Sequence, residues 1–133
     1  MKLQLIQTIQ DHTDRAWCCA WSPNGQYLAT SSADQSVRIY TTRQTISPSS
    51  SSSISSDEKQ TLEYKCVDEL KGHHTRTIRC ISWAPNNSVL ACASFDGTVT
   101  IWQKSNSPNF SSSSSSNKEQ LFECVSTLEG HEN

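Results

Sequence analysis

The sequence predicts an all-β protein made of two four-stranded antiparallel sheets, one from each copy of an internal repeat. The stretches 20–40 and 82–102 match along their length, and Trp21 precedes Tyr40 by the same 19 residues that separate Trp83 from Trp102. Short apolar runs alternate with turn residues, and no segment carries a convincing helical period. The same set of strands is therefore expected in both copies.

The strands of each copy are bounded by turn residues. Asn24-Gly25 predicts a tight hairpin turn because both residues tolerate positive φ, and Asn86-Asn87 does so more weakly. Asp34 and Asp96 mark the next turns. The expected strands are 16–21, 27–31, 36–40 and 66–70 in the first copy, then 78–83, 89–93, 98–102 and 124–128 in the second. Residues 3–9 are predicted as one more fourth strand, without a sheet of its own.

Serine-rich inserts follow the third strand of each copy. Residues 47–56 hold eight serines and residues 105–116 hold eight more. Such polar tracts cannot bury enough apolar surface to offset the entropy of ordering, so disordered loops are expected at about 44–61 and 104–119.

Composition and charge exclude several classes of protein. The net charge of −2 gives no basis for sequence-independent binding to nucleic acid or membranes. No apolar run is long enough for a spanning helix, and the N-terminus lacks a signal peptide, so an intracellular protein is expected. The six cysteines contain no C-x-x-C pair, and four of them recur at matching repeat positions. We therefore expect neither a metal site nor a cofactor.

These motifs resemble the WD40 repeat family. Gly72-His73, Asp96 and Trp102 match its framework of Gly-His, turn aspartate and closing tryptophan. The first copy departs from this pattern, since Asp11 replaces the glycine and Tyr40 the tryptophan. The resemblance implies a β-propeller, of which residues 1–133 form an N-terminal part. Its units are a closing-blade strand at 3–9, blade 1 at 12–70, blade 2 at 73–128 and the start of blade 3 at 129–133.

A narrower resemblance concerns residues 94–102 and 122–133. These strings are similar to blades 2 and 3 of the WD40 proteins of cytosolic iron–sulfur protein assembly. The resemblance implies a seven-bladed adaptor in the cytoplasm and nucleus that binds no cluster itself. Its expected partners are subunits of the targeting complex and a cluster-carrying protein. An adaptor of another kind, such as a ubiquitin-ligase substrate receptor or a chromatin subunit, remains the alternative.

Each copy combines histidine, serine, aspartate and an aromatic residue. A hydrolase triad would use the first three, but two copies at matching positions favour a structural network in place of catalysis. In the WD40 interpretation, aspartate bonds histidine, histidine bonds serine, and serine bonds the tryptophan ring. The expected sets are His12, Ser32, Asp34 and Tyr40, then His73, Ser94, Asp96 and Trp102. We therefore expect a non-enzymatic protein.

Five further residues are candidates for binding a protein partner. Tryptophan and arginine dominate binding hot spots, and these positions border the narrow face of a propeller. Packing at the rim or between blades would explain them equally well. The candidates are Arg15, Trp17, Arg76, Arg79 and Phe95.

Overall fold

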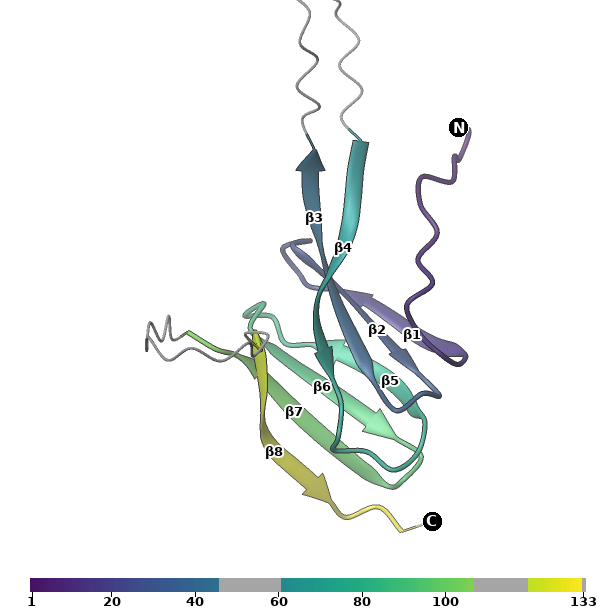
Figure 1. The fold of residues 1–133 in the computed structure, drawn as a ribbon. Coiled ribbons are helices and arrows are strands. Elements are labelled where there is room, and N and C mark those ends of the chain that lie inside the picture. Colours follow the sequence, from purple (N-terminus) through teal and green to yellow (C-terminus); the bar gives the residue numbers. More distant parts are fainter. Residues whose placement is uncertain (46–60, 107–119, 133) are drawn as a thin grey trace, which may run out of the picture.

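The computed structural model describes residues 1–45, 61–106 and 120–132. These residues form two four-stranded antiparallel sheets, ordered β1-β2-β3-β4 and β5-β6-β7-β8 (Figure 1). The strands are β1 Ala16–Trp21, β2 Tyr27–Ser32, β3 Val37–Thr45, β4 Thr61–Leu70, β5 Ile78–Trp83, β6 Val89–Ser94, β7 Thr98–Lys104 and β8 Phe122–Glu129. The predicted all-β fold class is confirmed. The part of the chain that the structure describes holds no helix with the length and apolar character needed to cross a membrane.

The predicted strand starts are closer to the structure than the predicted ends. The bounds of β1 and β5 are as expected, and β2 and β6 each run one residue further than expected. The turns between these strands use positive φ, at Gly25 and Asn87 before the second strands and at Gln35 and Gly97 before the third. Turn chemistry therefore places the hairpins correctly in both copies.

The β3–β4 hairpin is longer than predicted. Its antiparallel register continues to Thr45 and Thr61, so the expectation of a loop from about residue 44 to 61 is wrong at both ends. Figure 1 shows the two strands projecting beyond the rest of their sheet. Likewise, β7 includes Lys104, so the expected start of the second insert at about residue 104 is wrong. The expected disorder of both inserts otherwise concerns residues 46–60 and 107–119, outside the described residues.

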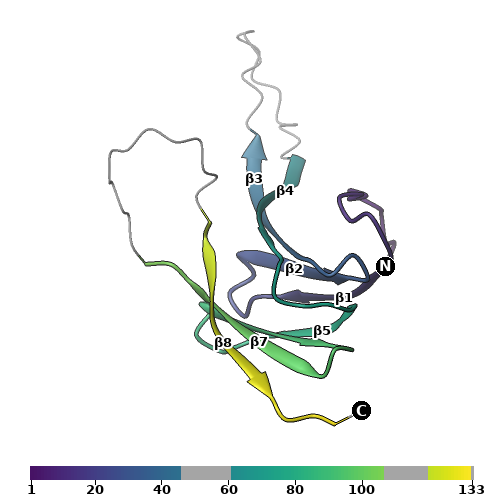
Figure 2. The same ribbon diagram turned by 60° about the horizontal axis from the view of Figure 1, so that its bottom comes forward.

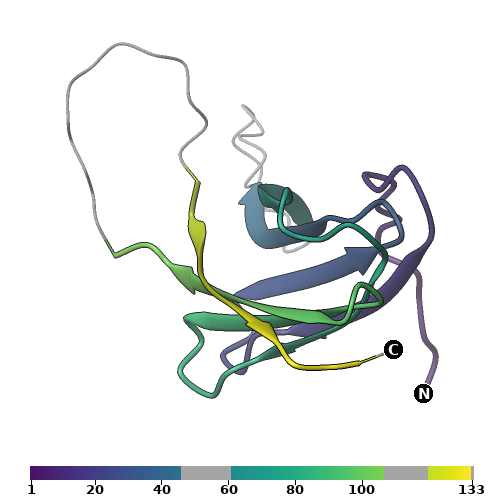
Figure 3. The same ribbon diagram turned by 90° about the horizontal axis from the view of Figure 1, so that it is seen from below.

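The two sheets pack face to face, with β5 lying against β1 and β2 (Figures 2 and 3). Tyr27 stacks on Trp83 with ring centroids 6.1 Å apart, and both rings meet the edge of Phe122 at 5.8 Å. The Trp83 Nε1–H donates to the Ala20 carbonyl at 3.0 Å. This junction buries most of the apolar core and fixes the relative position of the sheets.

Equivalent positions of the two sheets differ sharply in exposure. Leu70 is 1% exposed because it faces the second sheet, whereas Leu128 at the equivalent position of β8 is 52% exposed. On the opposite faces, Trp21 is 50% exposed, whereas its equivalent Trp83 lies in the junction. Each sheet therefore has one covered and one open face.

Residues 3–9 form no strand, contrary to the secondary structure expected there. The Gln7 side chain nevertheless bonds the backbone of β4 twice, accepting from the Tyr64 N–H at 2.9 Å and donating to the Tyr64 carbonyl at 3.0 Å. At the equivalent place in the second sheet, the Asp68 carboxylate accepts from the Phe122 N–H at 2.9 Å. Gln7 therefore bonds the backbone of β4 in the same way as Asp68, a residue of β4, bonds the backbone of β8.

Candidate functional site

A histidine–aspartate network lies beside the β2–β3 turn. The His12 Nδ1 is 2.8 Å from the Asp34 carboxylate, and its Nε2 is 2.7 Å from the Thr30 hydroxyl. Asp34 also accepts from the Ser36 N–H, the Ser36 hydroxyl and the Thr13 N–H. The network ties the segment before β1 to the turn and to β2.

The second sheet carries an equivalent network beside the β6–β7 turn. The His74 Nδ1 is 3.0 Å from Asp96, and its Nε2 is 2.8 Å from the Thr100 hydroxyl. The Trp102 Nε1–H donates to the same hydroxyl at 2.9 Å. This chain of hydrogen bonds has the expected order, from aspartate through histidine and a hydroxyl to the tryptophan ring.

Three of the predicted network residues are wrong. His73 does not contact Asp96 and packs against the Trp102 ring at 5.0 Å, edge to face. Ser32 and Ser94 lie next to the turn, where their hydroxyls accept from the N–H groups of Asp34 and Asp96. The correct histidine was visible in the sequence, because His74 precedes Asp96 by the same 22 residues that separate His12 from Asp34.

The hydroxyl that meets the histidine comes from a different strand in each sheet. Thr30 is on β2 and pairs across the ladder with Arg38, whereas Thr100 is on β7 and pairs with Cys92. Side chains of directly paired residues lie on one face and close together, so either member can bond the imidazole. The threonine that bonds the histidine therefore occupies one member of a cross-strand pair in the first sheet and the other member of the equivalent pair in the second sheet.

The network aspartates are held in their charged form. Burial acts to raise the pKa of Asp34, but hydrogen bonds from Ser36, His12 and Thr13 outweigh it and lower the pKa to about 2. Burial is opposed in the same way at Asp96, where hydrogen bonds from Thr98, Thr75 and His74 hold the pKa well below its ordinary value. Both carboxylates are therefore ionised and act as hydrogen-bond acceptors.

Tyr40 takes the place of the closing tryptophan in the first network. Its side chain is 1% exposed and lies beside Thr30 and Asp11. Burial, followed by the negative charge of Asp11, raises the pKa of the Tyr40 hydroxyl above its ordinary value. Asp11, which precedes the network histidine as His73 does in the second copy, therefore lies beside the closing aromatic residue, as His73 lies against Trp102.

Four of the five candidate partner-binding residues form one continuous strip across the junction. Trp17 and Phe95 meet edge to face at 6.5 Å. The Arg79 guanidinium lies 5.0 Å from the Trp17 ring centre, and the Arg76 guanidinium lies 6.0 Å from that of Phe95. We call Arg79, Trp17, Phe95 and Arg76 the rim strip. Arg15 is exposed, and the ring and guanidinium contacts that define the strip do not include it.

The repeat does not account for the rim strip. Framework residues recur at equivalent positions, but Phe95 corresponds to Ala33 and Arg76 to Asp14 in the first copy. Both strip aromatics remain accessible, with Trp17 41% and Phe95 46% exposed. The strip is therefore a local feature of this junction and is not required by the blade architecture.

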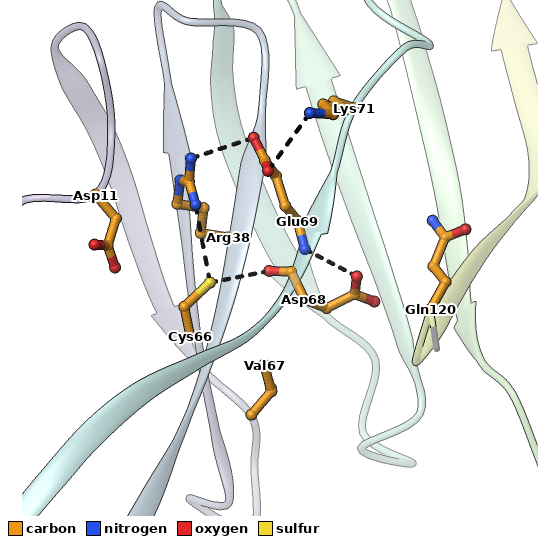
Figure 4. Close-up of a pocket in the computed structure, with 8 residues that line it drawn as sticks. All are labelled: Asp11, Arg38, Cys66, Val67, Asp68, Glu69, Lys71 and Gln120. Atoms are coloured by element: carbon orange, nitrogen blue, oxygen red, sulfur yellow. Dashed lines mark hydrogen bonds and ion pairs between the residues drawn. The ribbon is translucent and has the colours of Figure 1, made fainter. Parts of the chain in front are cut away.

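A hollow of about 690 Å³ lies along β4 on the outer side of the first sheet (Figure 4). Its cations are already paired, since Glu69 accepts from Arg38 at 3.2 Å and lies 3.6 Å from the Lys71 ammonium. Burial raises the pKa of Asp68, which accepts from the N–H groups of Phe122 and Glu69. Arg38, Lys71, Glu69 and Asp68 therefore have partners within the protein, and the hollow indicates no particular ligand.

The cysteines are dispersed over both sheets. Within residues 1–45, 61–106 and 120–132, no three side chains of the metal-binding types gather at one place. Burial raises the pKa of the Cys92 thiol to about 12, so this group stays protonated and unreactive.

Comparisons with known proteins identify relatives over nearly the whole chain. The family profile described as "WD domain, G-beta repeat" matches residues 3–41 and 64–103. Protein CIA1 of Arabidopsis thaliana is 38% identical over 98% of this chain and 31% of its own length. A probable cytosolic iron-sulfur protein assembly protein 1 of Cryptococcus neoformans is 30% identical over 99% of this chain and 34% of its own. A probable cytosolic Fe-S cluster assembly factor of Schizosaccharomyces pombe is 37% identical over 99% and 17%. The chain thus spans about a third or less of the length of these relatives.

Proposed function

The chain belongs to the WD40 repeat family, and we propose that it serves as a protein-interaction scaffold in the cytosolic assembly of iron–sulfur proteins. The observation that carries this proposal is the similarity to relatives whose names specify that process, over 98% and 99% of the chain. In this role the protein helps to deliver clusters to cytosolic and nuclear apoproteins. It acts in the cytoplasm and the nucleus.

The proposed role is adaptor binding without catalysis and without a cofactor of its own. The partners are subunits of a cytosolic targeting complex and the protein that carries the cluster to it. Each histidine–aspartate pair bonds a turn and a threonine, which supports a structural role for both networks. In this proposal the two networks hold the ends of the blades in place, and the partners bind elsewhere.

The proposed partner-binding surface consists of the rim strip together with Arg15. Its residue types are those that dominate binding hot spots, and its aromatic rings stay accessible beside the turns. Because the repeat does not require these residues, a role in recognition explains them better than a role in blade packing.

We propose that in the complete propeller residues 3–9 become the outer strand of a further blade, which covers the open face of blade 1. Gln7 supports this, because it engages the Tyr64 N–H as the outer-strand residue Asp68 engages the Phe122 N–H. The side chain thus holds the segment where an outer strand of a preceding blade would lie.

Depletion of the protein in its own cells tests the proposed function. We expect a cytosolic iron–sulfur enzyme to lose activity and bound iron, while a mitochondrial iron–sulfur enzyme keeps both. Re-expression of the full-length protein should restore the cytosolic enzyme. Equal loss in both compartments, or no loss in either, would contradict a role in cytosolic assembly.

A further inference from the structure

We propose that the rim strip binds an acidic, carboxylate-bearing segment of a protein partner. This inference rests on the proposed role of the strip as a partner-binding surface and adds the chemistry of what it binds. Arg79 and Arg76 supply the charge, and Trp17 and Phe95 supply the apolar surface between them.

The Arg79 guanidinium is positioned so that it can bind a carboxylate. Its guanidinium lies over the Trp17 ring at 5.0 Å, which restricts the side chain while leaving its N–H groups free in the plane of the group. The ion pairs found among the described residues do not involve Arg79. A stacked guanidinium with open N–H groups offers the planar fork that binds a carboxylate through two hydrogen bonds.

Arg76 is fixed in a similar way at the other end of the strip. One of its terminal nitrogens donates to the Phe95 carbonyl at 2.9 Å, and the guanidinium lies 6.0 Å from the Phe95 ring centre. The remaining N–H groups of Arg76 are available, and it too takes part in none of the ion pairs of the described residues.

No ion pair among the described residues offsets this positive charge. The two aspartates of the neighbouring turns are engaged by His12 and His74 and by backbone N–H groups. The protein as a whole carries a net charge of −2, so an acidic partner needs a local cationic site to approach it. The strip provides such a site.

The ring geometry favours a peptide over a nucleic acid. Single-stranded nucleic acids stack their bases on open aromatic faces. Here guanidinium groups lie over Trp17 and Phe95, and the two rings meet edge to face. The ring surface that stays exposed suits a single apolar side chain next to the bound carboxylate.

Selection from a random heptapeptide library on the immobilised full-length protein tests the proposal. We expect the selected peptides to be enriched in Asp and Glu beside an apolar residue. Arg79→Gln and Arg76→Gln should each weaken the binding of a selected peptide by about tenfold or more. Lys65→Gln removes the same charge from an exposed position of β4, outside the proposed partner-binding surface, and should change binding less than about twofold.

Thermal melting confirms that each variant is folded. Arg79→Lys should also weaken binding, because lysine keeps the charge but lacks the planar fork. Neutral or basic selected peptides, equal losses with Lys65→Gln, or a preference for an oligo-dT strand over the acidic peptides would overturn the proposal. Peptide selection and cellular depletion are independent readouts. Acidic peptides that bind the strip while depletion spares cytosolic enzymes would contradict the proposed function but not this inference.

Discussion

At the scale of single residues, the two histidine networks achieve one arrangement with different side chains. Thr30 on β2 and Thr100 on β7 both bond the Nε2 of the network histidine. The sequence could not predict this exchange, because it depends on which residues are paired across the ladder. It could predict the turn aspartates, since their spacing and turn chemistry are local. The prediction of His73 is wrong because it follows an alignment of the two copies that is shifted by one residue at this point.

Asp96→Ala should destabilise the protein. The substitution removes the acceptor of the Thr75 and Thr98 N–H groups and the partner of His74. We expect a loss of about 1–3 kcal/mol in the free energy of unfolding, measured by urea denaturation. Glu123→Ala, at an exposed position of β8, is the control and should have little effect. Unchanged stability together with lost partner binding would show that Asp96 is a binding residue instead.

Stability should also fall at acid pH through the same carboxylates. The pKa of Asp34 is about 2 in the folded protein, below its ordinary value near 3.8, so the folded state binds fewer protons than the unfolded state. The stabilisation is therefore complete above about pH 5 and is lost as the pH falls towards about 2. Thermal melting across this range should show the decline, and Asp34→Asn should make it shallower. A melting temperature that is constant between pH 6 and pH 3 would be inconsistent with this account.

At the scale of elements, the sequence located the core strands but underestimated the β3–β4 hairpin. Residues 41–45 and 61–65 are mostly polar, and apolar patterning alone gives them no strand signal. In the structure they are paired residue by residue, from Thr41 with Lys65 to Thr45 with Thr61. Backbone pairing with an existing strand extends the ladder without requiring an apolar face. Such an extension becomes visible only when the partner strand is known.

Gln7→Ala should release the N-terminal segment from β4. The Tyr64 N–H would lose its acceptor, and we expect its hydrogen exchange to accelerate by about tenfold. The Phe122 N–H, held by Asp68, is the internal control and should exchange as before. Unchanged exchange at Tyr64 would mean that Gln7 does not hold the segment in solution.

At the scale of the whole molecule, stability depends on the junction between the two sheets. Leu70→Ala removes a side chain that is 1% exposed and should cost about 2–5 kcal/mol of unfolding free energy. In the 133-residue chain, Leu128→Ala makes the same change at the equivalent repeat position, where the side chain is 52% exposed, and should cost less than about 0.5 kcal/mol. Chemical denaturation of both variants measures the difference. Equal costs would show that the open face of the second sheet is covered in solution.

The repeat explains why the architecture was predictable while the use of each face was not. Equivalent residues such as Leu70 and Leu128 have the same identity, so the sequence assigns them the same environment. Only the packing of one sheet on the other distinguishes them. The rim strip was predicted as separate residues of suitable type, but stacking of arginine on aromatic rings depends on that same junction.

Affinity capture of the full-length protein from a cytosolic extract tests whether the protein acts in iron–sulfur protein assembly. Mass spectrometry should identify co-purifying subunits of the cytosolic iron–sulfur targeting machinery. Arg79→Gln should reduce their recovery, whereas the control Lys65→Gln, outside the proposed binding surface, should reduce it less. Recovery of ubiquitin-ligase or chromatin subunits, with no protein of iron–sulfur assembly among them, would contradict the proposed function.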